Sequence, residues 1–154
     1  MSFVDNSWFN QQGIERAGRL SEKIRILLVD DHSEVLQGLR KLLTQEEDME
    51  IVGQCANGKE ALISAAVVSP DIILMDVRMP IIDGLEATHL LSKKGVSCKV
   101  IILSMFEEYL DEAMKSGAQG YLIKGIKQRE LAQAIRSVHH GEIVIYQTLA
   151  QSSN

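Results

Sequence analysis

The stretch LLVDDHS, residues Leu27 to Ser33, ends an apolar run with two adjacent carboxylates. The run Ile24–Val29 is apolar except for Arg25, as is typical of a strand that is buried on both faces. Aspartate is uncommon in strands and costly to bury. Two carboxylates about 4 Å apart repel by about 4 kcal/mol at an effective dielectric constant of about 20. Asp30 and Asp31 therefore need a positive partner from elsewhere in the fold.

Short apolar runs recur along the chain, and segments with helical periodicity separate them. We expect strands at Ile24–Val29, Glu50–Cys55, Ile72–Met75, Val100–Leu103 and Gly120–Ile123. Ser33 is the expected N-cap of the first helix, and Asp83 and Gly84 are expected to begin the third. Alternating strands and helices predict parallel βαβ units with helices on both faces of one sheet. The predicted fold class is α/β, a doubly wound five-stranded parallel sheet of the flavodoxin-like (βα)5 kind with strand order 2-1-3-4-5.

Bulk composition excludes several classes of function. The 154 residues suffice for one domain with a single core. A net charge of -5 argues against nucleic-acid binding by this chain alone. Cys55 and Cys98 lie far apart without a CxxC spacing, which favours a reducing cytoplasm over a disulfide framework or a zinc site. No apolar run approaches the roughly 20 residues of a membrane span, and the first residues lack the apolar centre of a signal peptide.

Polar side chains stand where several of the expected strands end. Asp30 and Asp31 follow the first strand, Asp76 the third, Ser104 the fourth and Lys124 the fifth. In a doubly wound sheet these ends share one edge, and the first and third strands are neighbours there. Three carboxylates and one ammonium leave two negative charges, which one divalent cation would neutralise.

The chemistry of this edge favours a hard cation. Oxygen donors suit Mg²⁺, which keeps several of its waters and takes one or two carboxylates together with phosphate. Once the cation is bound, a carboxylate can approach a phosphate anion and attack its phosphorus in line. The sequence therefore predicts phosphoryl transfer to an aspartate, assisted by the metal and the lysine.

The segment from about Lys23 to Gly141, which is about three quarters of the chain, resembles the receiver domain of two-component response regulators. The resemblance implies that Asp76, in LMDVRMPIIDG, accepts the phosphoryl group. It also implies that Asp31 binds Mg²⁺ directly, that Asp30 acts largely through water, and that the backbone carbonyl of Arg78 completes the protein ligands.

The same resemblance assigns the remaining strand-end residues. Ser104 would donate a hydrogen bond to the phosphoryl group, and Lys124 would pair with it. Tyr121 matches an aromatic position that swings inward when Ser104 is drawn towards the phosphate. One departure is Gly125, because many receivers have proline after the lysine.

Three stretches, VDDHSEVLQGLRKLL, LSMFEEYLDEAMKSGAQGYLIKG and AIRSVHHGE, look like the NarL/LuxR subfamily. Those regulators carry a helix-turn-helix DNA-binding domain after the receiver, and the residues after Gly141 are too few to form one. The chain is therefore either the receiver portion of a longer regulator or a stand-alone receiver. We expect the first, because the tail ends without a helix or a capping signal. DNA would then be contacted only through that missing domain.

The expected organisation has three parts. Residues 1–22 are expected to form a flexible extension, or an arm that docks through Trp8 and Phe9, and residues 23–141 the receiver domain. Residues 142–154 form a tail with an apolar patch at residues 143–146, which is an added strand, an interface segment or the start of a linker.

The expected function is a phosphorylation-dependent switch that modifies only its own Asp76 and is not otherwise an enzyme. Its expected partners are a sensor histidine kinase and, after phosphorylation, a second copy of the chain. A degenerate receiver that serves as an interaction module is the main alternative. A phosphatase of the haloacid dehalogenase type would need a DxD motif after the first strand. A flavodoxin-like cofactor binder would need a phosphate-binding loop at the same place.

His32 follows the acidic pair directly. It either tunes the acidic site or is an exposed turn residue.

Overall fold

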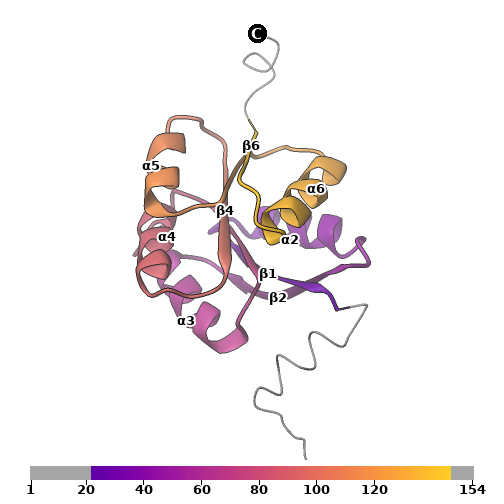
Figure 1. Ribbon diagram of the computed structural model, residues 1–154, viewed down its shortest axis with the longest axis horizontal. Coiled ribbons are helices and arrows are strands. Elements are labelled where there is room, and N and C mark those ends of the chain that lie inside the picture. The colour runs from indigo at the N-terminus through magenta and orange to yellow at the C-terminus, as the bar shows by residue number, and fades with distance from the viewer. Residues whose placement is uncertain (1–21, 147–154) are drawn as a thin grey trace, which may run out of the picture.

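The computed structural model describes residues 22–146, so most of the predicted N-terminal extension and the last residues of the tail lie outside it. Its elements, in chain order, are β1 (Ile24–Val29), α2 (Ser33–Leu43), β2 (Met49–Cys55), α3 (Gly58–Val68), β3 (Ile72–Met75), α4 (Gly84–Lys93), β4 (Lys99–Ser104), α5 (Leu110–Ser116), β5 (Gly120–Ile123), α6 (Gln128–His139) and β6 (Val144–Ile145). Figure 1 shows α3, α4 and α5 on one side of the sheet and α2 and α6 on the other.

The sheet has the order β2-β1-β3-β4-β5-β6, and all neighbouring strands are parallel. The predicted order 2-1-3-4-5 is confirmed, and a sixth strand is added at one edge. This strand comes from the apolar patch of the tail, where Val144 N–H donates to the Gln119 carbonyl over 3.1 Å and Tyr146 N–H to the Tyr121 carbonyl over 2.8 Å. Of the three alternatives for that patch, the structure shows the added strand.

Each central strand contributes to two apolar cores. Leu27 and Val29 belong to the cluster beneath α3, α4 and α5, whereas Ile26 and Leu28 belong to the cluster beneath α2 and α6. Successive side chains of a strand point to opposite faces, so a strand covered on both faces must be apolar at every position. This explains why β3 is a continuous apolar run and why β1 is apolar at every position except Arg25.

Side chains cap the starts of α3 and α4. At α3, Asn57 Oδ1 accepts from the Glu60 N–H over 2.9 Å. Asp83 Oδ1 accepts from the Glu86 N–H over 2.8 Å, as predicted for α4. The prediction for α2 is wrong by one residue, because His32 is its N-cap and Ser33 its first helical residue. The cause lies upstream: Asp30 Oδ1 accepts from the His32 N–H over 2.9 Å, which holds the turn that starts the helix.

The β3–α4 loop is packed tightly against the end of β3. Gly84 N–H donates to the Val77 carbonyl over 2.8 Å, and a Cβ at Gly84 would lie 1.8 Å from the Asp76 carbonyl oxygen. Only glycine allows the helix to start this close to the backbone of Asp76. The position of Asp76 is thus fixed from the strand side and from the helix side.

Candidate functional site

The carboxyl ends of β1, β3, β4 and β5 meet at one edge of the sheet and carry the predicted polar residues. Backbone hydrogen bonds hold these ends in place, because Asp76 N–H donates to the Val29 carbonyl over 2.9 Å and Lys124 N–H to the Ser104 carbonyl over 2.8 Å. The side chains of Asp30, Asp76, Ser104 and Lys124 are therefore brought to one place from four separate strands.

Lys124 is shared unequally between two buried carboxylates. Its Nζ lies 2.9 Å from Asp30 Oδ2 and 3.4 Å from Asp76 Oδ1. Asp30 and Asp76 are both buried, whereas Asp31 is exposed. Asp76 Oδ1 also accepts from the Val77 N–H over 2.8 Å. The lysine thus holds Asp30 and Asp76 together without reaching the third carboxylate.

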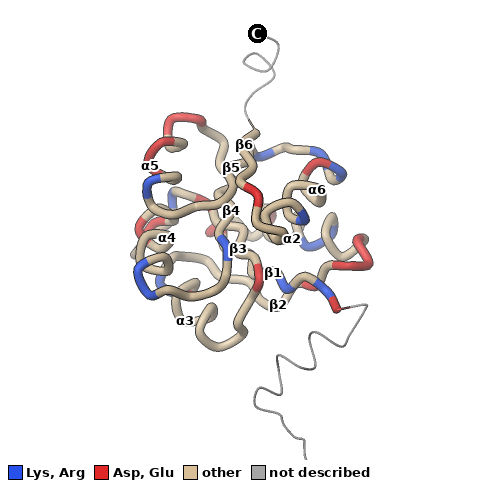
Figure 2. Tube along the Cα trace, viewed as in Figure 1, with Lys and Arg blue, Asp and Glu red and all other residues tan. Residues whose placement is uncertain are grey.

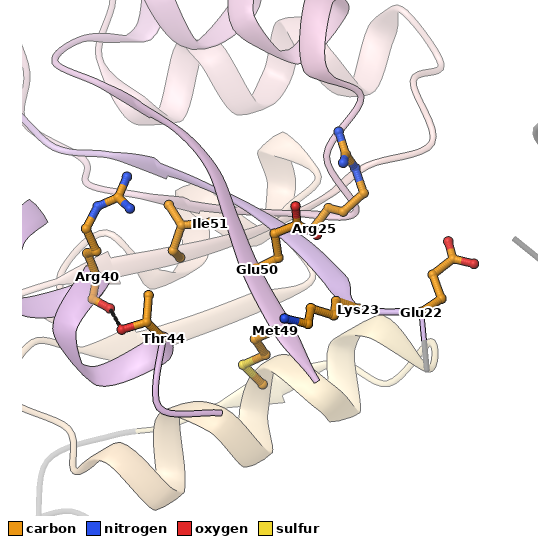
Figure 3. A pocket seen from close by; sticks show the side chains of 8 residues that line it. All are labelled: Glu22, Lys23, Arg25, Arg40, Thr44, Met49, Glu50 and Ile51. Atoms are coloured by element: carbon orange, nitrogen blue, oxygen red, sulfur yellow. Dashed lines mark hydrogen bonds between the residues drawn. The ribbon is translucent and has the colours of Figure 1, made fainter. Parts of the chain in front are cut away.

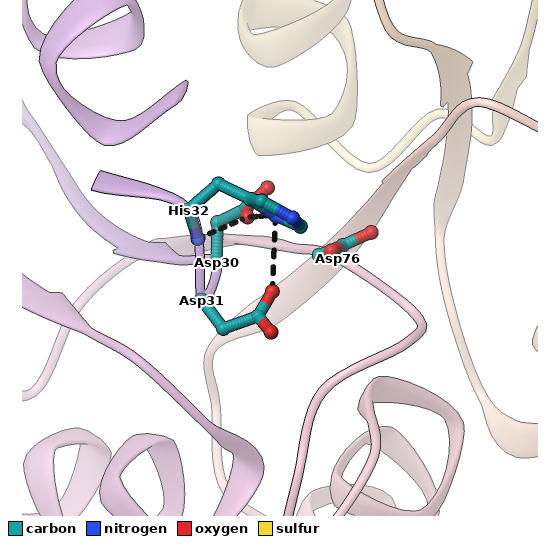
Figure 4. Close-up of side chains that lie close together, drawn as sticks. All are labelled: Asp30, Asp31, His32 and Asp76. Atoms are coloured by element: carbon teal, nitrogen blue, oxygen red, sulfur yellow. Dashed lines mark hydrogen bonds and ion pairs between the residues drawn. The ribbon is translucent and has the colours of Figure 1, made fainter. Parts of the chain in front are cut away.

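His32 joins the acidic cluster, as Figure 4 shows. Its Nδ1 lies 3.0 Å from Asp30 Oδ1 and 3.1 Å from Asp31 Oδ1, although its side chain is 55% exposed. The hydrogen bond to Asp30 and the negative charge of Asp31 raise the pKa of His32. The ring is therefore exposed, as expected of a turn residue, and it also contacts the acidic site. The one signal in the sequence is its position directly after the acidic pair.

The electrostatics of the cluster leave it short of positive charge. Burial raises the pKa of Asp76, and the neighbouring charge of Asp30 raises it further. Burial acts to lower the pKa of Lys124, but the hydrogen bond to Asp30 and the charge of Asp76 outweigh it, so the pKa of Lys124 is raised. The lysine therefore stays protonated at neutral pH, and the carboxylates still exceed the permanent cations around them.

The donor groups of this edge fit a divalent cation. Asp30, Asp31, His32 and Asp76 each offer one atom, and these atoms all lie within 4.8 Å of one another. Three carboxylates are the hard oxygen donors that Mg²⁺ prefers. Next to them is a cavity of about 230 Å³ lined by His32, Asp76, Arg78, Ser104, Met105, Phe106 and Lys124. A small anion could occupy it in contact with the carboxylate of Asp76.

Ser104 and Tyr121 are linked through the backbone of Phe106. Ser104 Oγ accepts from the Phe106 N–H over 3.1 Å, and the Tyr121 hydroxyl donates to the Phe106 carbonyl. Tyr121 is 1% exposed, so in this structure its ring already lies inward. Beyond Lys124, Gly125 has a φ of +92°, which the fixed negative φ of proline excludes. The β5–α6 connection here thus takes a path closed to proline.

Another cavity lies at the opposite end of the sheet, where β1 and β2 begin (Figure 3). Its volume is about 590 Å³, and its lining mixes acidic, basic and apolar side chains: Glu22, Lys23, Arg25, Arg40, Thr44, Met49, Glu50 and Ile51. None of the strand-end residues predicted from the sequence reaches it. The predicted site residues therefore lie at the other edge, where the strands end.

Basic and acidic residues alternate along the described part of the chain. Figure 2 shows lysines and arginines interspersed with acidic residues along residues 22–146. Within the same residues, no helix combines the length and apolar character that crossing a membrane requires.

Comparison with known proteins agrees with this geometry. The family described as the response regulator receiver domain matches residues 26–136. The response regulator GacA of Pseudomonas protegens is 40% identical over 130 residues, which cover 83% of this chain and 61% of GacA. The chain therefore spans about three fifths of the length of that relative.

Two solved structures share the fold. The signal receiver domain of the putative response regulator NarL from Mycobacterium tuberculosis superposes with a TM-score of 0.76 at 27% identity, covering 79% of this chain and 99% of that one. A LuxR-family two-component response regulator from Aurantimonas sp. SI85-9A1 gives 0.78 at 31% identity, covering 84% and 94%. With its parallel α/β fold and its acidic strand ends, this chain belongs to the response regulator receiver domain family, and it is of the NarL/LuxR type.

Proposed function

We propose that this chain is a signalling switch that accepts a phosphoryl group on Asp76. The observation that carries the proposal is the place of this carboxylate, which is buried at the end of β3 and lines a cavity together with Ser104 and Lys124. An oxygen of Asp76 forms the new bond to phosphorus, while the bond to the donor's leaving group breaks and the leaving group keeps the electron pair. The chain modifies only itself and turns over no other substrate.

The division of labour among the carboxylates follows their surroundings. When bound, Mg²⁺ would offset the negative charge of the carboxylates and of the phosphoryl oxygens. Asp31 is exposed and is not paired with Lys124, which suits direct ligation of the metal. The carboxylate of Asp76 and the backbone carbonyl of Arg78 would be the other direct ligands. Asp30 is buried with one oxygen on Lys124, which suits a contact to the metal through water. Lys124 already lies within reach of Asp76 and can pair with a phosphoryl oxygen.

The contacts of Ser104 supply a route from the phosphoryl group to the surface. Ser104 Oγ can donate its hydrogen to a phosphoryl oxygen while it still accepts from the Phe106 N–H. A shift of Ser104 towards the phosphoryl group would therefore move Phe106, and with it the hydrogen bond of Tyr121. Two arrangements of the β4–α5 loop, biased by phosphorylation, are sufficient for a switch.

The partners follow from the class of switch. We infer that a sensor histidine kinase supplies the phosphoryl group in the cytoplasm and that the phosphorylated chain forms a homodimer. GacA is longer than the part that this chain matches. We infer that a helix-turn-helix output domain, absent from these 154 residues, carries the contact with DNA.

The test is phosphorylation by a small donor. We expect that incubation with acetyl phosphate and Mg²⁺ adds one phosphoryl group, seen by intact mass, which hydroxylamine removes. EDTA or Asp76→Asn should abolish the adduct, while Asp111→Asn, at an exposed carboxylate on α5, should retain it. If no donor yields the adduct, the chain is a degenerate receiver. Sustained release of phosphate from many esters would show a phosphatase instead.

A further inference from the structure

The imidazole of His32 is directed at the acidic cluster and not at the helix that it precedes. His32 is the N-cap residue of α2, yet its side chain caps no backbone N–H. Its Nδ1 instead lies against Asp30 Oδ1 and Asp31 Oδ1, as Figure 4 shows. A hydrogen bond to Asp30 and the contact with Asp31, and not helix capping, therefore orient this ring.

The spacing of these atoms matches the edges of a coordination octahedron. Donors that bind one ion at about 2.1 Å lie about 3.0 Å apart when they are neighbours and about 4.2 Å apart when they are opposite. The Nδ1 of His32 lies 3.0 Å and 3.1 Å from the two Oδ1 atoms. The four candidate donor atoms, with that of Asp76 included, all fall within 4.8 Å. One ion could contact the nitrogen of His32 and the oxygens of Asp31 and Asp76 after a small inward movement of these side chains, while Asp30 contacts the ion through water.

A nitrogen donor changes which ions the site prefers. Mg²⁺ selects oxygen ligands, whereas first-row transition ions such as Co²⁺, Ni²⁺ and Zn²⁺ bind imidazole well. We propose that His32 is a metal ligand through Nδ1, which lets this site bind divalent transition metals through nitrogen and oxygen, whereas Mg²⁺ uses the oxygens alone. The inference rests on the proposed function in one respect, namely that the acidic edge is the metal site.

The main test compares two ions in two variants. Isothermal titration calorimetry of the full chain with Co²⁺ and with Mg²⁺ gives both dissociation constants for wild type and for His32→Gln. We expect the affinity for Co²⁺ to fall about tenfold or more in His32→Gln, since even the loss of a residue that hydrogen-bonds a metal ligand has an effect of about this size. The affinity for Mg²⁺ should change by less than about twofold. His89→Gln, which removes an exposed imidazole on α4, should change neither constant.

A direct readout identifies the donor atom. With Cu²⁺ in the site, an ion that imidazole suits, electron spin echo modulation detects a bound imidazole, and that signal should disappear in His32→Gln. The variant His139→Gln/His140→Gln removes the imidazole pair at the end of α6 and should keep the signal. A nitrogen signal that survives in His32→Gln, or equal changes for Co²⁺ and Mg²⁺, would overturn the proposal. Higher affinity for both ions in His32→Gln would also overturn it, because His32 would then compete with metals.

Failure of this inference can be told apart from failure of the proposed function. If Mg²⁺ binds and supports the adduct on Asp76, but Co²⁺ shows no dependence on His32, only the nitrogen ligand is wrong. If Asp31→Asn leaves the affinities for Mg²⁺ and Co²⁺ unchanged, the acidic edge is not the metal site, and both proposals fail together.

Discussion

Two clusters of charge in this molecule are built in opposite ways. The first, which we call the α6 clamp, joins Arg136 and Gln128 of α6 to Glu46 and Asp48 in the α2–β2 connection. Arg136 binds Asp48 through Nε at 2.7 Å and Nη2 at 2.8 Å, and Glu46 through Nη2 at 2.6 Å. Gln128 Nε2 donates to the other oxygen of Glu46 over 2.9 Å. All four carboxylate oxygens of the clamp have a donor.

The second cluster, the acidic edge, consists of Asp30, Asp31, Asp76, His32 and Lys124. Within the described residues, only Asp30 has donors on both carboxylate oxygens, whereas Asp31 and Asp76 each have them on one. The carboxyl groups of the clamp and that of Asp76 differ in the direction of their pKa shifts. Hydrogen bonds from Gln128 and Arg136 lower the pKa of Glu46, and the hydrogen bond from Arg136 lowers that of Asp48. Burial and Asp30 raise the pKa of Asp76. Charge in the clamp is arranged to hold the fold together, and charge at the acidic edge is arranged to receive a ligand.

The largest effect on stability is expected from breaking the clamp. Arg136→Met removes three charge-assisted hydrogen bonds and leaves two carboxylates facing each other, so we expect a loss of about 1 to 2 kcal/mol in the free energy of unfolding. The lower end of that range reflects the partial exposure of the pair. Urea denaturation of the metal-free chain measures it. Arg129→Met, at an exposed position of the same helix, should change stability by less than about 0.5 kcal/mol. Equal losses in the two variants would show that the clamp carries no special stability.

The contrast also marks what the sequence could and could not predict. The acidic edge was predictable because each of its parts follows a buried strand, and topology alone carries parallel strand ends to one edge. The clamp was missed because Arg136 and Glu46 are 90 positions apart and neither lies at a strand end. Pairing between a helix and a distant loop depends on packing that no local pattern records.

Finer details depended on side-chain direction, which hydrophobic periodicity does not determine. Ser33 is a better capping residue than His32 by type, but the hydrogen bond between Asp30 and the His32 N–H decides where α2 begins. The same turn places the ring of His32 beside both carboxylates. Of the tail, only the apolar patch could be recognised, and its pairing with β5 follows from the unpaired edge of that strand.

A smaller effect of opposite sign is expected at the acidic edge. Asp76→Asn removes a charge that burial and Asp30 both oppose, and Asn can still accept from the Val77 N–H. We therefore expect the metal-free chain to become more stable by about 1 kcal/mol, since burial destabilises this charge and Lys124 stays paired with Asp30 after the substitution. Urea denaturation in EDTA at pH 7 tests this. Added Mg²⁺ should stabilise the wild type more than the variant. Destabilisation by Asp76→Asn in EDTA would mean that the charge is already fully compensated without metal.

The smallest expected effects concern how the free energy of unfolding depends on pH. Lowering the pH should remove a stabilising contribution from the clamp and a destabilising one from Asp76. The lowered pKa values of Glu46 and Asp48 contribute stability that is present above the ordinary carboxyl pKa of about 4 and is lost below it. The difference in the free energy of unfolding between wild type and Arg136→Met should therefore stay constant from pH 7 to about pH 5. It should become smaller only below about pH 4. The raised pKa of Asp76 penalises the folded state above that pKa, and the penalty disappears as pH falls through it.

The gap between wild type and Asp76→Asn should accordingly narrow at weakly acidic pH, before the clamp begins to titrate. Urea denaturation in EDTA at steps between pH 7 and pH 4 measures both gaps. Titration of His32 cancels largely from each comparison, because all three chains carry it. If the Asp76→Asn gap stays flat down to about pH 4, Asp76 ionises as an ordinary carboxyl, and the acidic edge is as well compensated as the clamp. If the Asp76→Asn difference becomes smaller at higher pH than the Arg136→Met difference, the two clusters differ electrostatically. The carboxylates of the clamp are then compensated within the fold, whereas Asp76 is compensated only when a cation binds.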